Sequence, residues 1–356
     1  MTERPSFEVL LADRRGERDR WIQAWERWPA HEVYAHPSYV ELFAGQDGSA
    51  AAAVCQVDGT TVLYPFVIRS IRRERFWVPG CGDCVDITSP YGYGGAYRWG
   101  GGEPRPDEVF WRMFDEWASN AGVVSEFVRF DLHPERLASY PGTVESRLMN
   151  VIRSLDTPPE ELLADVAHKV RKNVKRARAS GIRVLLDEDG NRLEDFERIY
   201  LSTMVRREAD SRYLFSLDWL QRLVAALPGQ FAFFHAVKGD IVVSSELVLV
   251  SADFVYSFLG GTDSSAFADR PNDLLKYEVM LWARERGKQA FVLGGGYEPG
   301  DGIFKYKESF APRGVVPFST GSRVLDREKY SALARRAAEI RGPDAADAAF
   351  FPEYRA

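Results

Sequence analysis

Two lysines that follow a run of glycines are candidates for binding a charged substrate. Leu293–Phe310 reads LGGGYEPGDGIFKYKESF, with Lys305 and Lys307 two positions apart and Phe304 just before them. Glycine has no Cβ, so the backbone of Gly294–Gly296 could approach a bound group closely. If the lysine stretch is extended, both lysines point to one side and the aromatic rings to the other. The alternative is an ordinary glycine loop with solvated lysines.

A second candidate is the concentration of positive charge in residues 168–183, which read HKVRKNVKRARASGIR and contain no acidic residue. A helix over this stretch could neutralise the phosphates of a nucleic acid. The alternative is a solvated helix end, where the helix dipole favours cations. The candidate tRNA-binding residues are Lys169, Arg171, Lys172, Lys175, Arg176 and Arg178.

Two acidic residues lie where a substrate or a proton could be handled. Asp273 opens a predicted helix, and a helix start that faces a strand end can receive an anion or a carbonyl oxygen. Glu246 lies mid-strand between apolar residues, where burial would favour its neutral form and make it a candidate general base. The alternatives are a plain strand–loop–helix junction at Asp273 and a charge on a solvated strand face at Glu246.

The elements that would position these residues occur twice in the same order, which indicates a duplication. Each copy has two helices, antiparallel strands, a helix ended by glycine, and a buried strand. The Trp-Ala pairs at Trp117 and Trp282 precede Gly122 and Gly287 by the same interval. This order is that of a GNAT-type acyltransferase fold, unlike the strict strand–helix alternation of a doubly wound sheet. The expected elements are residues 19–28, 36–43, 51–57, 60–71, 109–117 and 123–130, then 193–207, 217–227, 231–237, 241–250, 254–259, 274–282 and 290–293.

Length and composition agree with a globular protein of two domains. The chain has 356 residues, 45% of them hydrophobic, and a net charge of -6. We expect an α/β (α+β) protein of two tandem GNAT-like modules, at 1–150 and 151–330, with a C-terminal helix and a loose tail over 331–356. The overall charge excludes a global positive field, so any contact with nucleic acid must be local. No export signal or membrane span is evident, so we expect a cytoplasmic monomer.

No pattern of a metal or cofactor site is found. Cys81 and Cys84 form a lone CxxC without a second ligand pair, and the five histidines are scattered, so we expect no metal. The phosphate-binding loop, the nucleophile elbow and HExxH are missing. Neither copy shows the R/Q-x-x-G-x-G/A turn that binds coenzyme A in ordinary acetyltransferases of this fold.

Three stretches of the second copy resemble the Fem family, the aminoacyl-tRNA-dependent peptidyltransferases that build peptidoglycan cross-bridges, and their relatives in natural-product pathways. They are the basic helix with its glycine at 169–181, YSFLGGTD and PNDLLKYE within 256–278, and LGGG, DGIFKYK and SF within 293–310. The resemblance implies transfer of an amino acid from the ester of a charged tRNA to an amine. That ester is already activated, so the enzyme needs no nucleophile of its own; the acceptor amine must lose a proton and the oxyanion must be stabilised.

The resemblance also implies roles for single residues. Lys307 matches the family's lysine in the F-K segment, which holds charge near the tRNA end, with Lys305 beside it. Tyr256 matches a tyrosine near the acceptor, and Arg212 with Tyr213 matches an arginine-rich, aromatic stretch that helps to bind acidic groups of the acceptor. The other candidate substrate-binding residues are Arg207, Asp273, Phe304, Tyr91 and Tyr93; the two last lie in an aromatic stretch that could equally be a core-edge loop.

The chain departs from the family in two respects. Some members carry a lysine in the first domain for a nucleotide-linked acceptor, but His36–Gly45 has no lysine. The long coiled-coil arm of some members is also missing. Both departures count against a cell-wall precursor as the acceptor.

We therefore expect an aminoacyltransferase without a resident cofactor. Its co-substrate would be a charged tRNA, and its acceptor the amine of a small molecule or peptide. One alternative is an N-acyltransferase that uses acetyl-CoA or another acyl-CoA. Another is a non-catalytic RNA-binding protein that uses only the basic helix.

Overall fold

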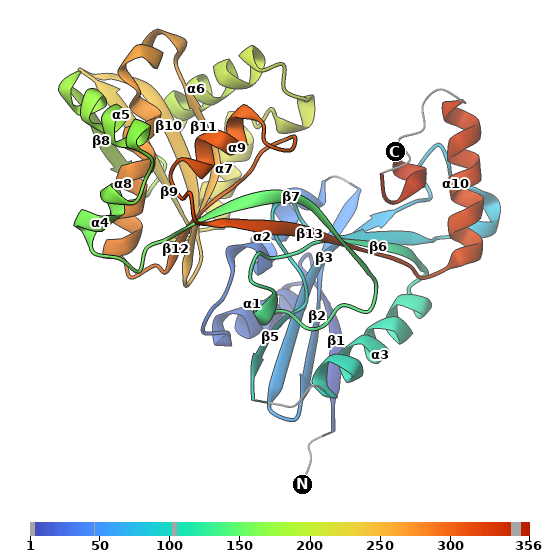
Figure 1. Cartoon of the computed structure of the whole chain (residues 1–356). Coiled ribbons are helices and arrows are strands. Elements are labelled where there is room, and N and C mark those ends of the chain that lie inside the picture. Colours follow the sequence, from blue (N-terminus) through green and yellow to red (C-terminus); the bar gives the residue numbers. More distant parts are fainter. Residues whose placement is uncertain (1–3, 46, 102–104, 343–349) are drawn as a thin grey trace. The chain divides into compact units, whose positions relative to one another are not determined.

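The computed structural model describes residues 4–45, 47–101, 105–342 and 350–356 (Figure 1). The chain divides into two compact units. It passes from unit 1 to unit 2 within β7 (Thr143–Ser154) and returns within β13 (Val315–Val324). Unit 1 consists of Met1–Pro29, Tyr34–Arg147 and Phe318–Ala356, and unit 2 of Ala30–Val33 and Leu148–Pro317.

This division differs from the expected ranges in two places. Residues 30–33 group with unit 2, and residues from Phe318 onward group with unit 1. The reason for the second difference is that the end of β13 pairs with β6 (Val123–Arg129), whose residues 125–129 oppose residues 320–324.

Unit 1 is built on a sheet with the strand order β1-β2-β3-β4-β6-β13, and β5 pairs with β3. Within it β4 and β6 run parallel, and the other pairs are antiparallel. The helices α1 (Arg15–Arg27) and α2 (Pro37–Ala44) contact β2, as does α3 (Arg105–Asn120), while α10 (Arg327–Arg341) contacts β6. The remaining strands are β1 (Ser6–Leu11), β2 (Gly48–Val57), β3 (Thr60–Ser70), β4 (Val85–Thr88) and β5 (Tyr97–Gly100).

The strands expected at residues 51–57 and 60–71 of unit 1 are confirmed and form a hairpin. Val57 pairs with Thr60, so Asp58 and Gly59 form a two-residue turn. Both turn residues have positive φ, 46° and 76°. Aspartate followed by glycine suits this turn, because its backbone matches the twist of the two strands only when both central residues adopt positive φ.

Unit 2 has the strand order β7-β12-β11-β10-β9-β8, in which β11 and β12 run parallel. Figure 1 shows α5 and α8 on one side of these strands and α6 and α7 on the other. The strands are β8 (Ile182–Asp187), β9 (Phe231–Lys238), β10 (Ile241–Val250), β11 (Phe254–Thr262) and β12 (Ala290–Gly295). The helices are α4 (Pro159–Ala164), α5 (His168–Ala179), α6 (Leu193–Arg206), α7 (Leu217–Ala226), α8 (Pro271–Glu285) and α9 (Gly302–Glu308).

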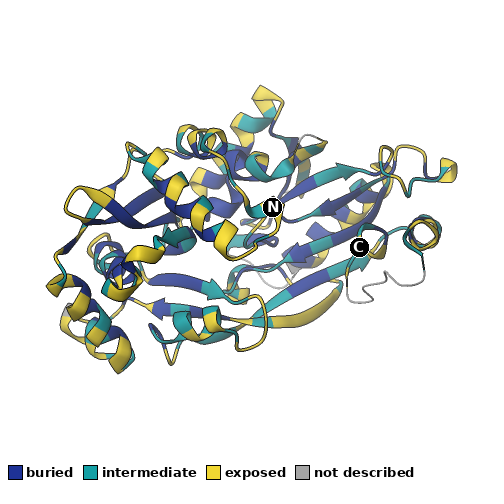
Figure 2. Ribbon diagram, turned by 90° about the horizontal axis from the view of Figure 1, so that it is seen from above, coloured by how far each residue is buried: buried dark blue, intermediate teal, exposed yellow. Residues whose placement is uncertain are grey.

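Alternate residues of the strands of unit 2 bury two different cores, as period-two side-chain geometry requires. On the side of α8, residues such as Phe234, Val248 and Phe291 pack with Leu275 and Val279. On the side of α6, Val237 and Val242 pack with Ile199. Figure 2 shows the same arrangement as buried strands and helices that expose their outer sides.

The expected succession of helices, antiparallel strands, helix and strand is found in both units. Six strands, β1, β4, β5, β7, β8 and β13, lie outside the expected elements. These strands are hard to recognise because they are short or only partly buried: β4 and β5 have four residues each, and β1 contains one fully buried residue and β13 two. They carry little of the hydrophobic signal on which strand prediction rests.

The parallel strands β11 and β12 pair over only three residues. Phe254–Tyr256 oppose Ala290–Val292, and beyond them the two strands no longer pair with each other. From Ser257 onward β11 is paired only with β10, on its other side, and Gly294 and Gly295 of β12 are paired only with β7. The strands therefore diverge at Ser257 and Leu293, and the side chains around this divergence are those from which the candidate site is built.

The end of the chain is not a loose tail over its described residues. Residues 350–356 include the short helix η6 (Glu353–Arg355), and Tyr354 is only 1% exposed. Its hydroxyl lies 2.6 Å from Ser125 Oγ, and Arg355 forms ion pairs with Asp86 and Glu74. The low-complexity residues 343–349, also expected to belong to the tail, lie outside the described residues.

This packing predicts a stabilising role for the end of the chain. Tyr354→Ala removes a buried ring that contacts Phe76 and Tyr330, so we expect the free energy of unfolding to fall by about 3 kcal/mol or more. Phe350→Ala in the same segment is the control, because Phe350 is 43% exposed and its loss should have little effect. Urea denaturation measures both, and equal stabilities would contradict the prediction.

Candidate functional site

The segment with the two lysines is helical and not extended, so the condition under which both lysines would point to one side is not met. Asp301 caps α9: its Oδ1 accepts a hydrogen bond of 2.6 Å from the backbone N–H of Phe304. Two positions along a helix correspond to a rotation of about 200°, so Lys305 and Lys307 lie on different sides. Lys305 is exposed, whereas Lys307 is partly buried.

The glycine run before α9 is shaped by the same carboxylate. Asp301 Oδ2 accepts hydrogen bonds from the backbone N–H groups of Tyr297 (2.7 Å) and Glu298 (3.3 Å). A Cβ at Gly296 would collide with the Asp301 side chain. These backbone hydrogen bonds, the one from Phe304 foremost, lower the pKa of Asp301. At Gly296, the missing side chain therefore allows the backbone to lie close to the Asp301 carboxylate.

Lys307 reaches back from α9 to the end of β12. Its Nζ donates a hydrogen bond of 2.6 Å to the carbonyl oxygen of Gly295. The pKa of Lys307 is lowered to about 8, mainly by burial and then by the Lys276 ammonium, while Glu246 and Asp301 act in the opposite direction. A lysine with this pKa can act near neutral pH both as a cation and as a proton carrier.

Glu246 of β10 is buried, with 2% exposure, so the alternative of a solvated strand face is excluded. Lys276 Nζ forms an ion pair with Glu246 Oε1 and donates a hydrogen bond of 2.7 Å to Ser257 Oγ at the strand divergence. Glu246 Oε2 has no hydrogen-bond partner among the described residues. Of the two carboxylate oxygens of Glu246, the candidate base, one therefore has a partner, Lys276.

Lys276 was not among the predicted site residues. The sequence feature that could have identified it is its position one turn before Met280 and two turns before Ala283, on the buried side of an apolar helix. A charged residue in that position usually has a buried partner.

Asp273 and Tyr306 complete a polar cluster around Lys307. Asp273, in the first turn of α8, is 6% exposed, accepts a hydrogen bond of 3.0 Å from Asn173, and has its pKa raised by burial. The Tyr306 hydroxyl is buried, and its pKa is raised by burial and then by the carboxylates of Asp273 and Glu246. We call Glu246, Asp273, Lys276, Tyr306 and Lys307 the Lys307 cluster.

The basic helix α5 packs on α8 through Val170, Val174 and Ala177, so its other side faces solvent. Of the six predicted tRNA-binding residues, Lys169, Lys172, Lys175 and Arg176 are exposed on one face that spans about 120°. We call these four residues the α5 basic face.

The other two basic residues of α5 have partners in the fold. Arg171 donates to the carbonyl oxygens of Ala164 and Val166, at 2.6 Å each. Arg178 pairs with Glu278 at 2.9 Å. They are therefore less available to a ligand than the α5 basic face.

The start of α5 is joined to the end of α9. The backbone N–H of Ala167 donates a hydrogen bond of 2.9 Å to the carbonyl oxygen of Ser309, which follows α9 directly. Asn173 of α5 holds Asp273 of the Lys307 cluster. The α5 basic face and the Lys307 cluster are therefore fixed to each other within unit 2.

The other predicted substrate-binding residues of unit 2 are more scattered. Arg207, at the end of α6, is exposed and close enough to Lys307 to lower its pKa. Arg212 is exposed, pairs with Asp210 at 2.9 Å and lies over the Tyr213 ring. Tyr256 is buried and donates a hydrogen bond of 2.8 Å to Glu32. Phe304 packs, partly buried, against the core on the α8 side.

Tyr91 and Tyr93 belong to unit 1, where they form part of an aromatic group with Tyr34, Tyr39 and Phe43. Tyr39 donates a hydrogen bond of 2.8 Å to the carbonyl oxygen of Tyr91. Tyr91 is 39% exposed, while burial raises the pKa of Tyr93. The structure thus places these two candidates in a different unit from the Lys307 cluster.

Comparison with known proteins shows which fold surrounds this site. Residues 164–308 match the family described as acetyltransferase (GNAT) domain. The whole chain is similar to the crystal structure of FemX, with a TM-score of 0.66 and 13% identity over 88% of this chain and 97% of that one. The chain has a FemX-like fold with a GNAT domain. The expected fold class of two GNAT-like modules is thereby confirmed.

Two further solved structures share the FemX-like fold. One is the C-terminal domain of a putative lysylphosphatidylglycerol synthetase from Agrobacterium fabrum, with a TM-score of 0.53 and 14% identity over 91% of this chain and 96% of that one. The other is a conserved protein of unknown function from Bacteroides thetaiotaomicron, with a TM-score of 0.53 and 13% identity over 90% of this chain and 99% of that one. No curated protein sequence matches the chain.

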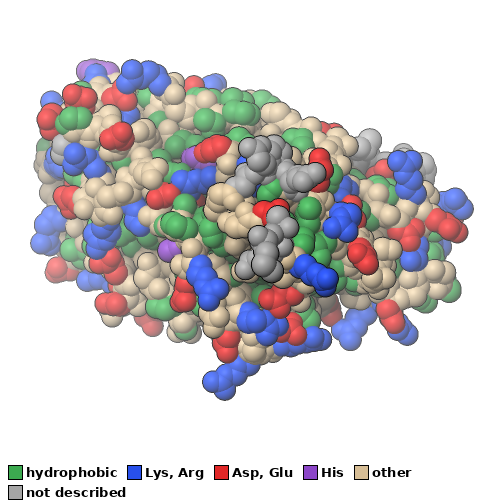
Figure 3. Space-filling model, turned by 90° about the horizontal axis from the view of Figure 1, so that it is seen from below, with side chains coloured by type: hydrophobic (Ala, Val, Ile, Leu, Met, Phe, Trp, Pro, Cys, Tyr) green, Lys and Arg blue, Asp and Glu red, His purple; other side chains and the backbone are tan. Residues whose placement is uncertain are grey.

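The GNAT domain contains both the α5 basic face and the whole Lys307 cluster, since these lie between Lys169 and Lys307. Among the described residues, no group of three or more His, Cys, Asp or Glu side chains could hold a metal ion. No helix in the described ranges is long and apolar enough to cross a membrane. On the face that Figure 3 presents, acidic and basic side chains are interspersed.

A serine, a histidine and an aspartate also meet in the GNAT domain, on the α6 side. His235 Nδ1 lies 2.6 Å from Ser245 Oγ, and its Nε2 lies 3.6 Å from Asp187 Oδ2. His235 and Ser245 are at most 1% exposed, and Asp187 is 7% exposed. No substrate carbonyl can reach a serine buried in this way, so the three residues link β8, β9 and β10 structurally.

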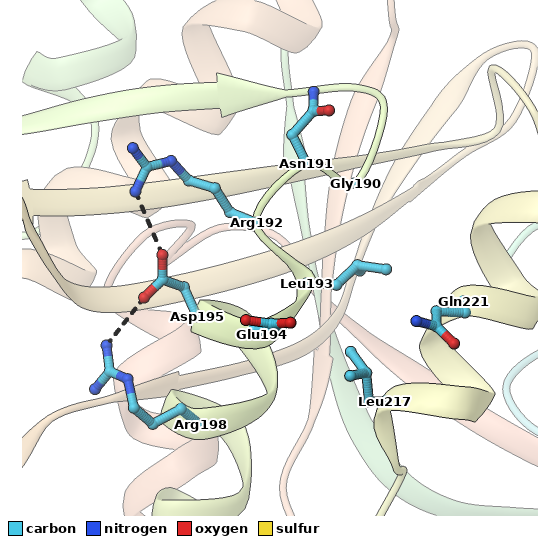
Figure 4. A pocket seen from close by; sticks show the side chains of 9 residues that line it. All are labelled: Gly190, Asn191, Arg192, Leu193, Glu194, Asp195, Arg198, Leu217 and Gln221. Carbon is cyan, nitrogen blue, oxygen red and sulfur yellow. Dashed lines mark hydrogen bonds and ion pairs between the residues drawn. The ribbon is translucent and has the colours of Figure 1, made fainter.

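A pocket of about 800 Å³ opens at the start of α6 (Figure 4). Asp195 lies between Arg192 and Arg198 and pairs with both, at 3.3 and 3.4 Å. Leu193, Leu217 and Gln221 line the other side. The pocket contains none of the predicted site residues, and three of its four charged side chains, those of Arg192, Asp195 and Arg198, pair with one another.

The pKa of Lys307 provides a direct test of the site. In protein labelled with ¹³C at lysine Cε, we expect the Lys307 signal to titrate near pH 8, because burial disfavours its charged form. The signal is assigned by its loss in Lys307→Arg. A midpoint at the ordinary lysine value of about 10.4 would contradict the burial of this amine.

The lowered pKa of Lys307 also makes the stability of the protein depend on pH. Between pH 8 and the unfolded value the unfolded chain binds more protons at this position, so the contribution of Lys307 to stability rises with pH. Lys307→Met should therefore be more stable than the wild type at pH 7, and this advantage should shrink as the pH is raised to 10. Urea denaturation at both values measures it.

Proposed function

We propose that the protein transfers an aminoacyl group from a charged tRNA to the amine of a small-molecule or peptide acceptor. The observation that carries the proposal is the connection between the α5 basic face and the Lys307 cluster. Four exposed cations lie on a helix whose start is bonded to the end of α9, which carries Lys307. A phosphate backbone bound on α5 would thus place its esterified end near a partly buried lysine.

The chemistry requires charge stabilisation rather than a nucleophile. The acceptor nitrogen attacks the ester carbonyl, the C–N bond forms, and the C–O bond to the ribose breaks. Lys307, which a pKa of about 8 keeps mostly protonated at pH 7, would stabilise the developing oxyanion. Glu246 Oε2, which has no partner among the described residues, would accept the proton of the acceptor amine, and the ribose oxygen takes up a proton on leaving.

The comparisons support the proposal at the level of acyl transfer. The matched family is an acetyltransferase family, and the similar structures include FemX and a synthetase whose named product carries a lysyl group. We propose Arg207, Arg212, Tyr213, Tyr256, Asp273 and Phe304, all of unit 2, as acceptor-side residues. We further propose that the chain acts as a monomer in the cytoplasm, where charged tRNA is found.

A second candidate is an acyl-CoA-dependent N-acyltransferase, favoured by the description of the family that residues 164–308 match. It requires an acyl thioester as the donor in place of the aminoacyl ester. Acetyl-CoA must therefore be included as a donor in every assay. Product formation from acetyl-CoA and none from charged tRNA would establish this candidate and exclude the first.

The proposed role of Lys307 predicts a loss of catalysis without a loss of binding. In Lys307→Met we expect the rate of aminoacyl transfer or ester loss to fall by about 10²–10³, the usual effect of removing one oxyanion-stabilising group. The affinity for charged tRNA should change little. Lys305→Met is the control, since Lys305 is exposed on the other side of α9. Equal rates for the two variants would exclude Lys307 from the reaction.

The α5 basic face predicts salt-dependent binding of tRNA. For Lys172→Glu we expect the Kd for tRNA to rise by about tenfold and the slope of log Kd against log salt to decrease by about 1. Arg222→Glu is the control: Arg222 is 61% exposed on α7, outside the basic face. Nitrocellulose filter binding at several salt concentrations measures both, and an equal effect of the two substitutions would show that only overall charge matters.

A further inference from the structure

Tyr297 is an exposed aromatic residue beside the proposed reaction centre. Its side chain is 66% exposed, and it lies two residues after Gly295, whose carbonyl oxygen binds Lys307 Nζ. Two residues span at most about 7.6 Å between their Cα atoms. The ring is therefore attached close to the point where Lys307 is held.

The loop that carries Tyr297 is fixed by internal hydrogen bonds. Asp301 accepts from the backbone N–H groups of Tyr297, Glu298 and Phe304, at 2.7, 3.3 and 2.6 Å. Gly296 leaves no room for a Cβ beside the Asp301 carboxylate, so the backbone before the ring is also determined. These hydrogen bonds lower the pKa of Asp301, which keeps it charged at neutral pH.

The Tyr297 ring, carried by this fixed backbone, presents an apolar surface to solvent. Among the described residues, no second ring stacks on Tyr297 and no cation lies over it, in contrast to Phe267, which stacks under Arg206. Because the loop backbone is already held, only the Tyr297 side chain loses conformational freedom when a flat group stacks on its ring. Stacking on an aromatic side chain is the usual way in which proteins bind unpaired bases.

Both donors considered above contain adenine, but at different places. In an aminoacyl-tRNA the terminal adenine is attached to the ribose that carries the ester. In an acyl-CoA the pantetheine arm and the pyrophosphate separate the adenine from the thioester. A stacking surface two residues from the anchor of Lys307 fits the first arrangement, in which adenine and reacting carbonyl are close together.

The geometry points to Tyr297 as the stacking platform for the terminal adenine of the charged tRNA. This inference rests on the proposed function, because it places the reacting ester at Lys307. It adds a recognition element for the nucleotide next to the ester, apart from the phosphate contacts on α5. It also gives a structural reason for a tRNA donor in place of an acyl-CoA.

The experiment compares tRNA with and without its terminal adenosine, since binding of uncharged tRNA already reports stacking. We expect Tyr297→Ala to raise the Kd for complete tRNA by about tenfold and to leave the Kd for the truncated tRNA unchanged. Tyr297→Trp should restore the affinity. Phe267→Ala, at a residue 44% exposed in the same unit, is the matched control and should leave the preference for complete tRNA intact.

The outcomes separate this inference from the proposed function. If wild type and Tyr297→Ala bind complete and truncated tRNA alike, while charged tRNA still donates its amino acid, the stacking platform is wrong and the transferase stands. If charged tRNA donates nothing to any amine and Tyr297→Ala weakens the binding of acetyl-CoA, both are overturned. Loss of the terminal-adenosine preference in Tyr297→Ala alone supports the platform.

Discussion

The early divergence of β11 from β12 is the constraint on which the arrangement of unit 2 depends. Parallel strands normally continue side by side, but here only three residue pairs form, after which β11 remains paired only with β10 and β12 only with β7. Beyond these pairs, the carbonyl oxygen of Gly295 accepts a hydrogen bond from Lys307, and the Ser257 hydroxyl accepts one from Lys276. Side chains from α8, α9 and β10 can meet there because no continuous pair of strands closes the space between them.

Charged groups in this position are costly, and their pairing is incomplete. Burying Glu246 and Lys276 removes both from water, and only part of that cost is regained by their ion pair. The same cost of removing a charge from water lowers the pKa of Lys307 to about 8. A stability-optimised core would place apolar residues here, so retention of unsatisfied polar atoms such as Glu246 Oε2 is typical of a functional site.

The sequence predicted the repeated order of elements, including the paired strands at 51–57 and 60–71 and at 231–237 and 241–250, because strong apolar patterning acts locally. It failed at α9, where the capping of Phe304 by Asp301 outweighed the alternation of aromatic and basic residues. It also placed Lys305 and Lys307 together, although only the latter turns inward. The partner of Glu246 could not be predicted, since Lys276 lies 30 residues away and only the packing of α8 on β10 joins them.

The two units have the same succession of elements, but their buried carboxylates, Glu126 and Glu246, differ in how many of their oxygens have hydrogen-bond partners. In unit 1, Glu126 is fully buried, and both of its oxygens have partners: Tyr64 donates to Oε1 at 2.6 Å, and Tyr140 and Arg323 donate to Oε2. Arg323 is in turn enclosed by the rings of Trp111, Phe114 and Tyr140. Such a saturated group can hold a core together but cannot accept another proton donor. Glu246 retains one oxygen without a partner among the described residues, so a donor that arrives with the substrate could bind there. This difference in saturation, rather than a difference in fold, is the reason to assign the proposed chemistry to unit 2.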